Sequence, residues 1–142
     1  MFKPKEDVSN TNRGKIKAMF ASCVPDSAAY TVAYSTVAKT GIFSTKIINY
    51  VVGFSKERRE LVIIPIDDEV TEHGEPISLT PDNVASAKKN LQGQWVIKSN
   101  AADKLLLSVP GYTVSMGEAM YTLPLIQEEE AAAFIKFMQE TF

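Results

Sequence analysis

The side chains that most often carry nucleophilic chemistry are scarce in this chain, which has one cysteine, Cys23, and one histidine, His73. A thiol beside an imidazole can act as a nucleophilic dyad. Cys23, however, continues an apolar helical pattern, and His73 lies among acidic residues. Because a free cysteine in apolar surroundings is usually a small packing residue, we interpret Cys23 as a core residue and His73 as a solvated loop residue.

Metal and cofactor sites find little support in the residue types present. Structural zinc sites use about four Cys or His ligands, and this chain has one of each. The carboxylates between Asp67 and Glu75 could attract a hard cation, but they lack the spacing of an EF-hand loop, and the alternative is an acidic surface loop. No phosphate-binding glycine motif occurs. We therefore expect no catalytic residue, no metal and no cofactor, and we predict that the protein is not an enzyme.

Basic side chains are the remaining candidates for contact with a ligand. Those in or beside two predicted turns could meet an anion or a lipid headgroup: Lys39, Lys46, Lys56, Arg58 and Arg59. Ile42 and Phe43, between the first two lysines, would add an apolar tip. Lysines beside exposed apolar residues suit an anionic membrane surface. Ordinary solvated turns are the alternative interpretation.

The charge of the chain is small but unevenly distributed. The 15 basic and 17 acidic residues give a net charge of −2. Residues 1–60 carry ten of the basic and five of the acidic side chains, and residues 61–142 carry five and twelve. Either folding mixes these surfaces, or a basic face meets an anionic partner. The isoelectric point near 5.4 argues against a dedicated nucleic-acid-binding domain.

The length of 142 residues favours a single domain. We predict a polar N-terminal arm over residues 1–10 and one domain over residues 11–142. A helix over residues 11–23 is indicated because Ile16, Met19, Phe20 and Cys23 recur at helical spacing. This helix could pack against one of three surfaces: the domain's own sheet, a second copy of the chain, or a lipid interface.

Alternating apolar and polar residues predict about seven strands between residues 28 and 110. They cover residues 28–37, 42–54, 60–66, 77–79, 84–88, 94–99 and 104–109. The segment 84–88 is also compatible with a helix that starts at Thr80. Because the connections are short, neighbouring strands should be antiparallel.

The C-terminal part predicts a cover for this sheet. Residues 112–125 are irregular and apolar, including Met116, Met120 and Tyr121, and should pack over an edge or end of the sheet. A helix over about residues 127–140 begins with three glutamates, which the helix dipole favours. Its apolar face requires burial and contains Phe134, Ile135, Phe137, Met138 and Phe142. The sequence thus predicts a mainly β fold, a curled antiparallel sheet or barrel capped by a C-terminal helix, with an added N-terminal helix.

Six segments carry a resemblance in element order: IFSTKIINYVVGFS, KERRE, LVIIPID, QGQWVIKS, DKLLLSV and EEEAAAFIKFMQETF. From about residue 28 to residue 142 the chain resembles the pleckstrin-homology-like barrel, most closely the small bacterial cytoplasmic domains of that fold, many of unassigned function. The resemblance implies a seven-stranded barrel with a C-terminal helix over one corner. In lipid-binding members, basic residues near the first hairpin hold inositol phosphates. Here that hairpin, AKTGIFSTK, lacks their dense Lys/Arg pattern.

These observations favour a non-catalytic cytoplasmic binding or scaffold module whose partner is a protein or peptide, taken along an exposed sheet edge. No secretory signal and no apolar run of about 20 residues is present. One alternative is a small-ligand or enzymatic β-barrel with a cavity lined by Tyr30, Tyr34, Tyr50 and Trp95. Another is recruitment to an anionic membrane through the basic N-terminal half. A homodimer through strand edges or the N-terminal helix also remains open.

Overall fold

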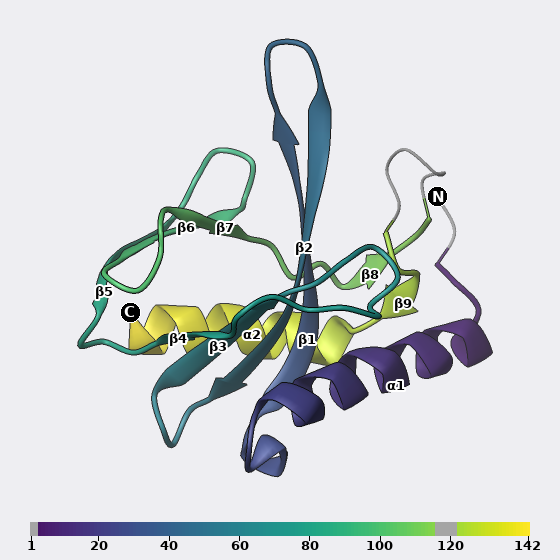
Figure 1. Cartoon of the computed structure of the whole chain (residues 1–142), viewed down its shortest axis with the longest axis horizontal. Coiled ribbons are helices and arrows are strands. Elements are labelled where there is room, and N and C mark those ends of the chain that lie inside the picture. Colours follow the sequence, from purple (N-terminus) through teal and green to yellow (C-terminus); the bar gives the residue numbers. More distant parts are fainter. Residues whose placement is uncertain (1–2, 116–121) are drawn as a thin grey trace.

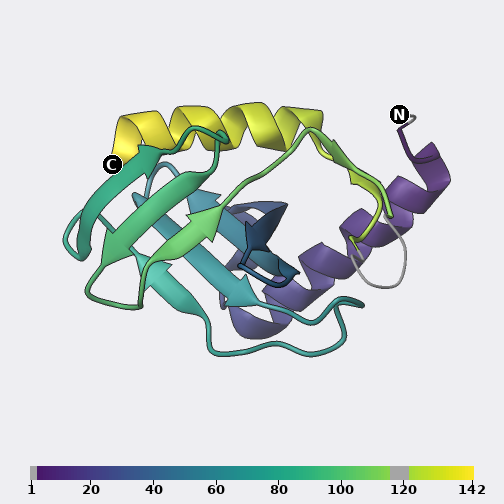
Figure 2. The ribbon, with the colours of Figure 1, turned by 90° about the horizontal axis from the view of Figure 1, so that it is seen from above.

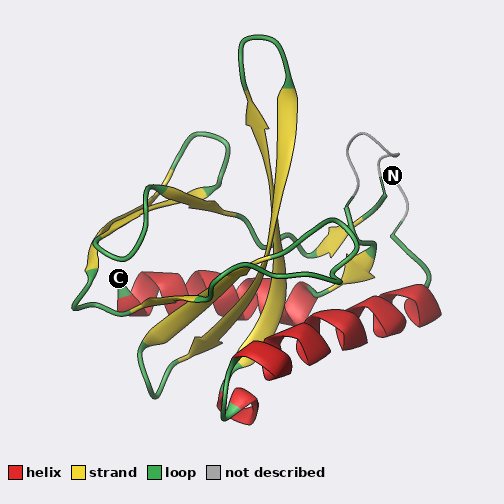
Figure 3. Cartoon of the chain, in the orientation of Figure 1, coloured by secondary structure: helices red, strands yellow, loops and turns green. Residues whose placement is uncertain are grey.

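The computed structural model describes residues 3–115 and 122–142. Along these ranges the chain forms the following elements: α1 Glu6–Cys23, η1 Ser27–Ala29, β1 Thr31–Thr40, β2 Thr45–Ser55, β3 Glu60–Pro65, β4 Ile77–Leu79, β5 Val84–Lys89, β6 Trp95–Ser99, β7 Leu105–Leu107, β8 Tyr112–Thr113, β9 Leu125–Ile126 and α2 Glu128–Thr141. Figure 1 shows their arrangement and Figure 3 the helices, strands and loops. The prediction of a mainly β fold with one helix near each end is confirmed.

The strands form three antiparallel sheets, in the orders β1-β2-β3-β4, β5-β6-β7 and β8-β9. The first is the central sheet, with α1 against one of its faces and α2 against the other (Figures 1 and 2). The sheets are not closed into a barrel. Near the end of β7 the second sheet approaches β1, where the amide of Thr36 donates to the Ser108 carbonyl over 3.0 Å.

The central sheet is apolar on both faces, so the chain has a core on each side of it. On one side, Val51 packs with Ile16 and Phe20 of α1. On the other side, Val52 packs with Phe134 of α2 and with residues of the second sheet. Successive residues of a strand point to opposite faces, which is why neighbours in β2 belong to different cores.

α1 approaches the sheet most closely at a glycine of β2. The ring of Phe20 lies directly over Gly53, and a Cβ atom placed there would come within 2.1 Å of Phe20 Cζ. Phe20 itself is fully buried. A side chain at position 53 would therefore push α1 away from the sheet.

The N-terminal arm predicted for residues 1–10 is wrong beyond residue 5, because the helix begins at Glu6. Its first turn carries Glu6 and Asp7, which the helix dipole favours. Ser9 and Asn12 are buried, and they hydrogen bond to the backbone of Ile126 and Pro124. Ser9, which was assigned to the polar arm, and Asn12, which lies in the predicted helix, thus hold α1 against the segment around β9.

The apolar face of α1 shows which surface the helix packs against. Ile16 and Phe20 are buried against the domain's own sheet. The first of the three alternatives is therefore confirmed, and the face required for a lipid interface is occupied.

The other predicted elements fall close to their expected places. Residues 84–88 form strand, within β5, and the closing helix spans Glu128–Thr141. Ile135 is 38% exposed, so it lies outside the buried face to which it was assigned. Short strands β8 and β9 occupy the ends of the segment expected to be irregular. Met116, Met120 and Tyr121 lie outside the described residues.

We expect Gly53→Ala to lower the free energy of unfolding by about 1–3 kcal/mol, because the added methyl group overpacks against the Phe20 ring. Urea denaturation followed by the fluorescence of Trp95 measures this change. In a Phe20→Ala background the same substitution should be close to neutral, since the obstructing ring is gone. Equal costs in both backgrounds would contradict the proposed contact.

Candidate functional site

The β1–β2 hairpin projects beyond the rest of the fold (Figure 1). Its strands pair as far as Thr40 and Thr45, and the Gly41 amide closes the loop by donating to the Ser44 carbonyl over 2.7 Å. β3 pairs with β2 only from Tyr50 onward. The outer part of the hairpin is therefore a two-stranded ribbon. We call residues 39–46 the hairpin tip.

The hairpin tip carries two large apolar side chains with almost no cover. Ile42 is 93% exposed and Phe43 is 99% exposed. Scattered exposed apolar residues are ordinary, but a contiguous pair at the end of a projection is a feature of interaction surfaces. The two side chains contribute nothing to the core of this chain.

Two lysines stand behind this apolar pair. Lys39 and Lys46 are direct cross-strand partners and are both exposed. Like charges facing each other across an antiparallel pair destabilise it, and neither lysine makes an ion pair within residues 3–115 and 122–142. No acidic residue occurs between residues 27 and 56. The hairpin tip thus has two exposed apolar side chains at its end and, behind them, two lysines whose positive charges no described acidic residue pairs with.

The other predicted anion contacts lie at the opposite end of β2, in the β2–β3 turn. There Lys56 Nζ is 3.8 Å from a carboxylate oxygen of Glu140. Arg59, with a left-handed φ of 50°, has a guanidinium nitrogen 3.5 Å from the Thr141 carbonyl. The structure therefore divides the five basic candidates into two groups and does not bring them together.

Arg58, the third basic residue of that turn, belongs to a polar network around Tyr30. Its guanidinium lies 3.6 Å from Asp26 and stacks 5.4 Å from the centre of the Tyr30 ring. The Tyr30 hydroxyl donates to Glu60. Burial and this hydrogen bond raise the pKa of Tyr30, so the phenol stays protonated and remains a donor. These contacts hold the β2–β3 turn against the residues that precede β1.

In the acidic loop of residues 67–75, the carboxylate of Asp67 forms hydrogen bonds within the loop itself. Asp67 accepts hydrogen bonds from the amides of Thr71 and Glu72, over 2.7 and 2.8 Å, and from the Thr71 hydroxyl. Burial acts to raise the pKa of Asp67, but these hydrogen bonds outweigh it and lower the pKa. The described parts of the chain contain no group of three or more His, Cys, Asp or Glu side chains suited to a metal ion.

The side chains considered for catalysis lie on separate elements. Cys23, at the end of α1, is partly buried against the core beneath that helix. His73 Nδ1 contacts the Gly74 carbonyl over 2.8 Å and is exposed. No hydrogen bond joins these two described residues.

The four aromatic residues proposed to line a cavity do not surround a common space. Tyr34 belongs to the core under α1, whereas Tyr50 and Trp95 belong to the core on the other side of the sheet. Tyr30 immediately precedes β1 and contacts Arg58 of the β2–β3 turn. The interior arrangement required for a small-ligand barrel is therefore not formed by these residues.

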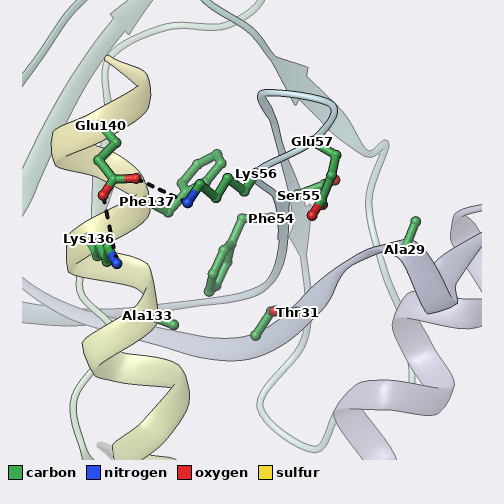
Figure 4. A pocket seen from close by; sticks show the side chains of 10 residues that line it. All are labelled: Ala29, Thr31, Phe54, Ser55, Lys56, Glu57, Ala133, Lys136, Phe137 and Glu140. Carbon is green, nitrogen blue, oxygen red and sulfur yellow. Dashed lines mark ion pairs between the residues drawn. The ribbon is translucent and has the colours of Figure 1, made fainter.

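A site that the sequence analysis missed lies along the free edge of β1. The side-chain amide of Gln127 pairs with Tyr34 as a strand residue would, accepting from its amide and donating to its carbonyl, both over 2.8 Å. Next to this point a groove of about 350 Å³ runs between α1 and α2. A second pocket, of about 260 Å³, continues it beside α2 (Figure 4). No local sequence signal marks Gln127, because its partner is 93 residues away.

No family model, no curated protein and no solved structure matches the chain, so these comparisons assign it to no family. Among the described residues, no helix combines the length and the apolar composition needed to span a bilayer.

We expect Lys46→Glu to strengthen the outer hairpin, because it replaces a cross-strand repulsion with an attraction opposite Lys39. The amide of Lys39 should show a hydrogen-exchange protection factor about 1.5–5 times higher, which corresponds to roughly 0.2–1 kcal/mol. Lys46→Gln, which removes only the repulsion, should give an intermediate value. Unchanged protection in both variants would show that the lysines do not repel each other.

Proposed function

We propose that this protein is a non-catalytic binding module that docks on an anionic membrane surface through the hairpin tip. The observation that carries the proposal is the pair of uncovered side chains, Ile42 and Phe43, in front of the uncompensated pair Lys39 and Lys46. In this arrangement the apolar pair enters the boundary between headgroups and acyl chains. The lysines then lie at the level of the lipid phosphates.

Magnitudes indicate a reversible association. Burying a large apolar side chain contributes about 1.5–3 kcal/mol, and each lysine near an anionic leaflet contributes about 1 kcal/mol. Two of each give about 5–8 kcal/mol, before the cost of immobilising the protein at the surface. One hairpin tip therefore suits recruitment to a membrane and not permanent anchoring.

The same proposal includes a relationship to pleckstrin-homology-like domains. It is supported by the order of antiparallel strands followed by a C-terminal helix, and by the approach of β7 to β1 at Thr36 and Ser108. We place the protein on the cytoplasmic side, where anionic lipids concentrate. In this proposal the hairpin tip contributes an apolar end in place of a dense basic pattern.

Flotation with vesicles of phosphatidylcholine and phosphatidylserine tests the apolar part of the tip. We expect Phe43→Ser to weaken the association at least about tenfold, because it removes a side chain whose burial contributes roughly 1.5–3 kcal/mol. Leu91→Ser is the matched control, since Leu91 is also fully exposed but lies in the β5–β6 turn. Equal losses in the two variants would overturn the assignment to the hairpin tip.

The charged part is tested with the same vesicles. Lys39→Gln combined with Lys46→Gln should weaken association by about 2 kcal/mol, or roughly thirtyfold. Association should also decline with added salt and vanish on vesicles of phosphatidylcholine alone. If the wild-type chain does not float with anionic vesicles at low salt, the proposed function is wrong.

A further inference from the structure

The inner half of β1 has a free edge, and its backbone groups can be followed residue by residue. β1 is the first strand of the central sheet, so only one of its sides is paired with β2. The amide and carbonyl of Tyr34 point away from β2, because both are bonded to the Gln127 side chain. Outward groups recur at every second residue of an antiparallel strand. The amide and carbonyl of Val32 therefore point outward too.

The chain itself covers part of this edge. The Thr36 amide is bonded to the Ser108 carbonyl, and Tyr34 is bonded to Gln127. This internal hydrogen bonding does not extend to Val32. No residue within 3–115 or 122–142 hydrogen bonds to the outward amide and carbonyl of Val32. An N–H and a C=O with strand geometry are thus presented at the point where internal pairing stops.

Val32 lies in a groove between the two helices. The groove, of about 350 Å³, has Lys17 of α1 on one wall and Glu130 of α2 on the other. The helices are joined at one end of it by the ion pair between Arg13 and Glu130, and they diverge from there (Figure 2). The edge of β1 is therefore recessed between two walls.

The adjoining pocket has an apolar base. It shares Thr31 with the groove, and Phe54, Ala133 and Phe137 face into it (Figure 4). Its volume is about 260 Å³. The ion pair of Lys56 and Glu140 forms part of its rim.

From these contacts we infer that an extended segment of a partner polypeptide binds in the groove as an additional strand on β1. It would pair with the amide and carbonyl of Val32 and place an apolar side chain against Ala133 and Phe137. Pairing along a free edge supplies the affinity of such complexes, and pockets for alternate side chains supply the specificity.

The recess decides between an extended peptide and a second copy of the chain. A copy's own β1 edge lies between its own α1 and α2, so two such edges cannot approach each other. A single extended segment has no flanking helices and fits between the walls. The site also lies on the inner half of β1, away from the hairpin tip, so the inference does not rest on membrane docking.

Selection of random peptides of about 12 residues, displayed on phage, against the whole chain supplies the probe. One enriched peptide is then synthesised, and its dissociation constant is measured for the wild type, Val32→Ala and Val32→Pro. Both variants lose side-chain packing, but only proline removes the outward amide, and this amide takes no part in the β1–β2 ladder. We expect Val32→Pro to bind at least tenfold more weakly than Val32→Ala.

A second pair of variants keeps the test independent of any effect of proline on folding. Ala133→Trp fills the pocket, whereas Ala132→Trp adds the same side chain to an exposed neighbouring position of α2 outside it. The first should weaken binding of the selected peptide at least tenfold, and the second should leave it unchanged.

Three outcomes would overturn the inference. They are the enrichment of no peptide, equal affinities within each pair of variants, and concentration-dependent dimerisation that Ala133→Trp abolishes. The last result would assign the groove to a second copy.

Discussion

The central sheet must be covered on both faces, and this constraint organises the molecule. Val51 and Val52 are neighbours in β2, point to opposite sides, and are both fully buried. A sheet with one solvated face would need only one covering layer. This one needs two, and α1 on one side and α2 with the second sheet on the other supply them.

The positions of the two covering layers explain the free edge. α1 and α2 lie on opposite faces but meet near the start of α2, where Arg13 contacts Glu130. At that corner the outward backbone groups of Tyr34, which is fully buried, need partners because unpaired buried polar groups are costly. The Gln127 side chain supplies them, and Val32 lies beyond its contacts. The groove at Val32 is thus a consequence of how a sheet buried on both sides is joined to its helices.

The two halves of β1 have different surroundings and different proposed roles. The inner half lies between helices and presents backbone groups, whereas the outer half projects beyond the rest of the fold and leads to the hairpin tip, which carries Phe43. A module arranged in this way could hold a partner segment near a membrane while both sites are occupied. The division follows from the length of β1. Its residues 36–40 pair with residues 45–49 of β2, and β3 pairs with β2 only from Tyr50 onward.

Local patterns in the sequence determined the strand segments, the closing helix, and the exposed apolar pair between two lysines. These features depend on residues that are neighbours along the chain, so alternation and helical spacing were sufficient to predict them. The tertiary structure alone decided that Ser9 belongs to α1 and that Gln127 completes the edge of β1. The physical reason is that each of these depends on contacts between segments far apart in the sequence, whose pairing no local pattern encodes.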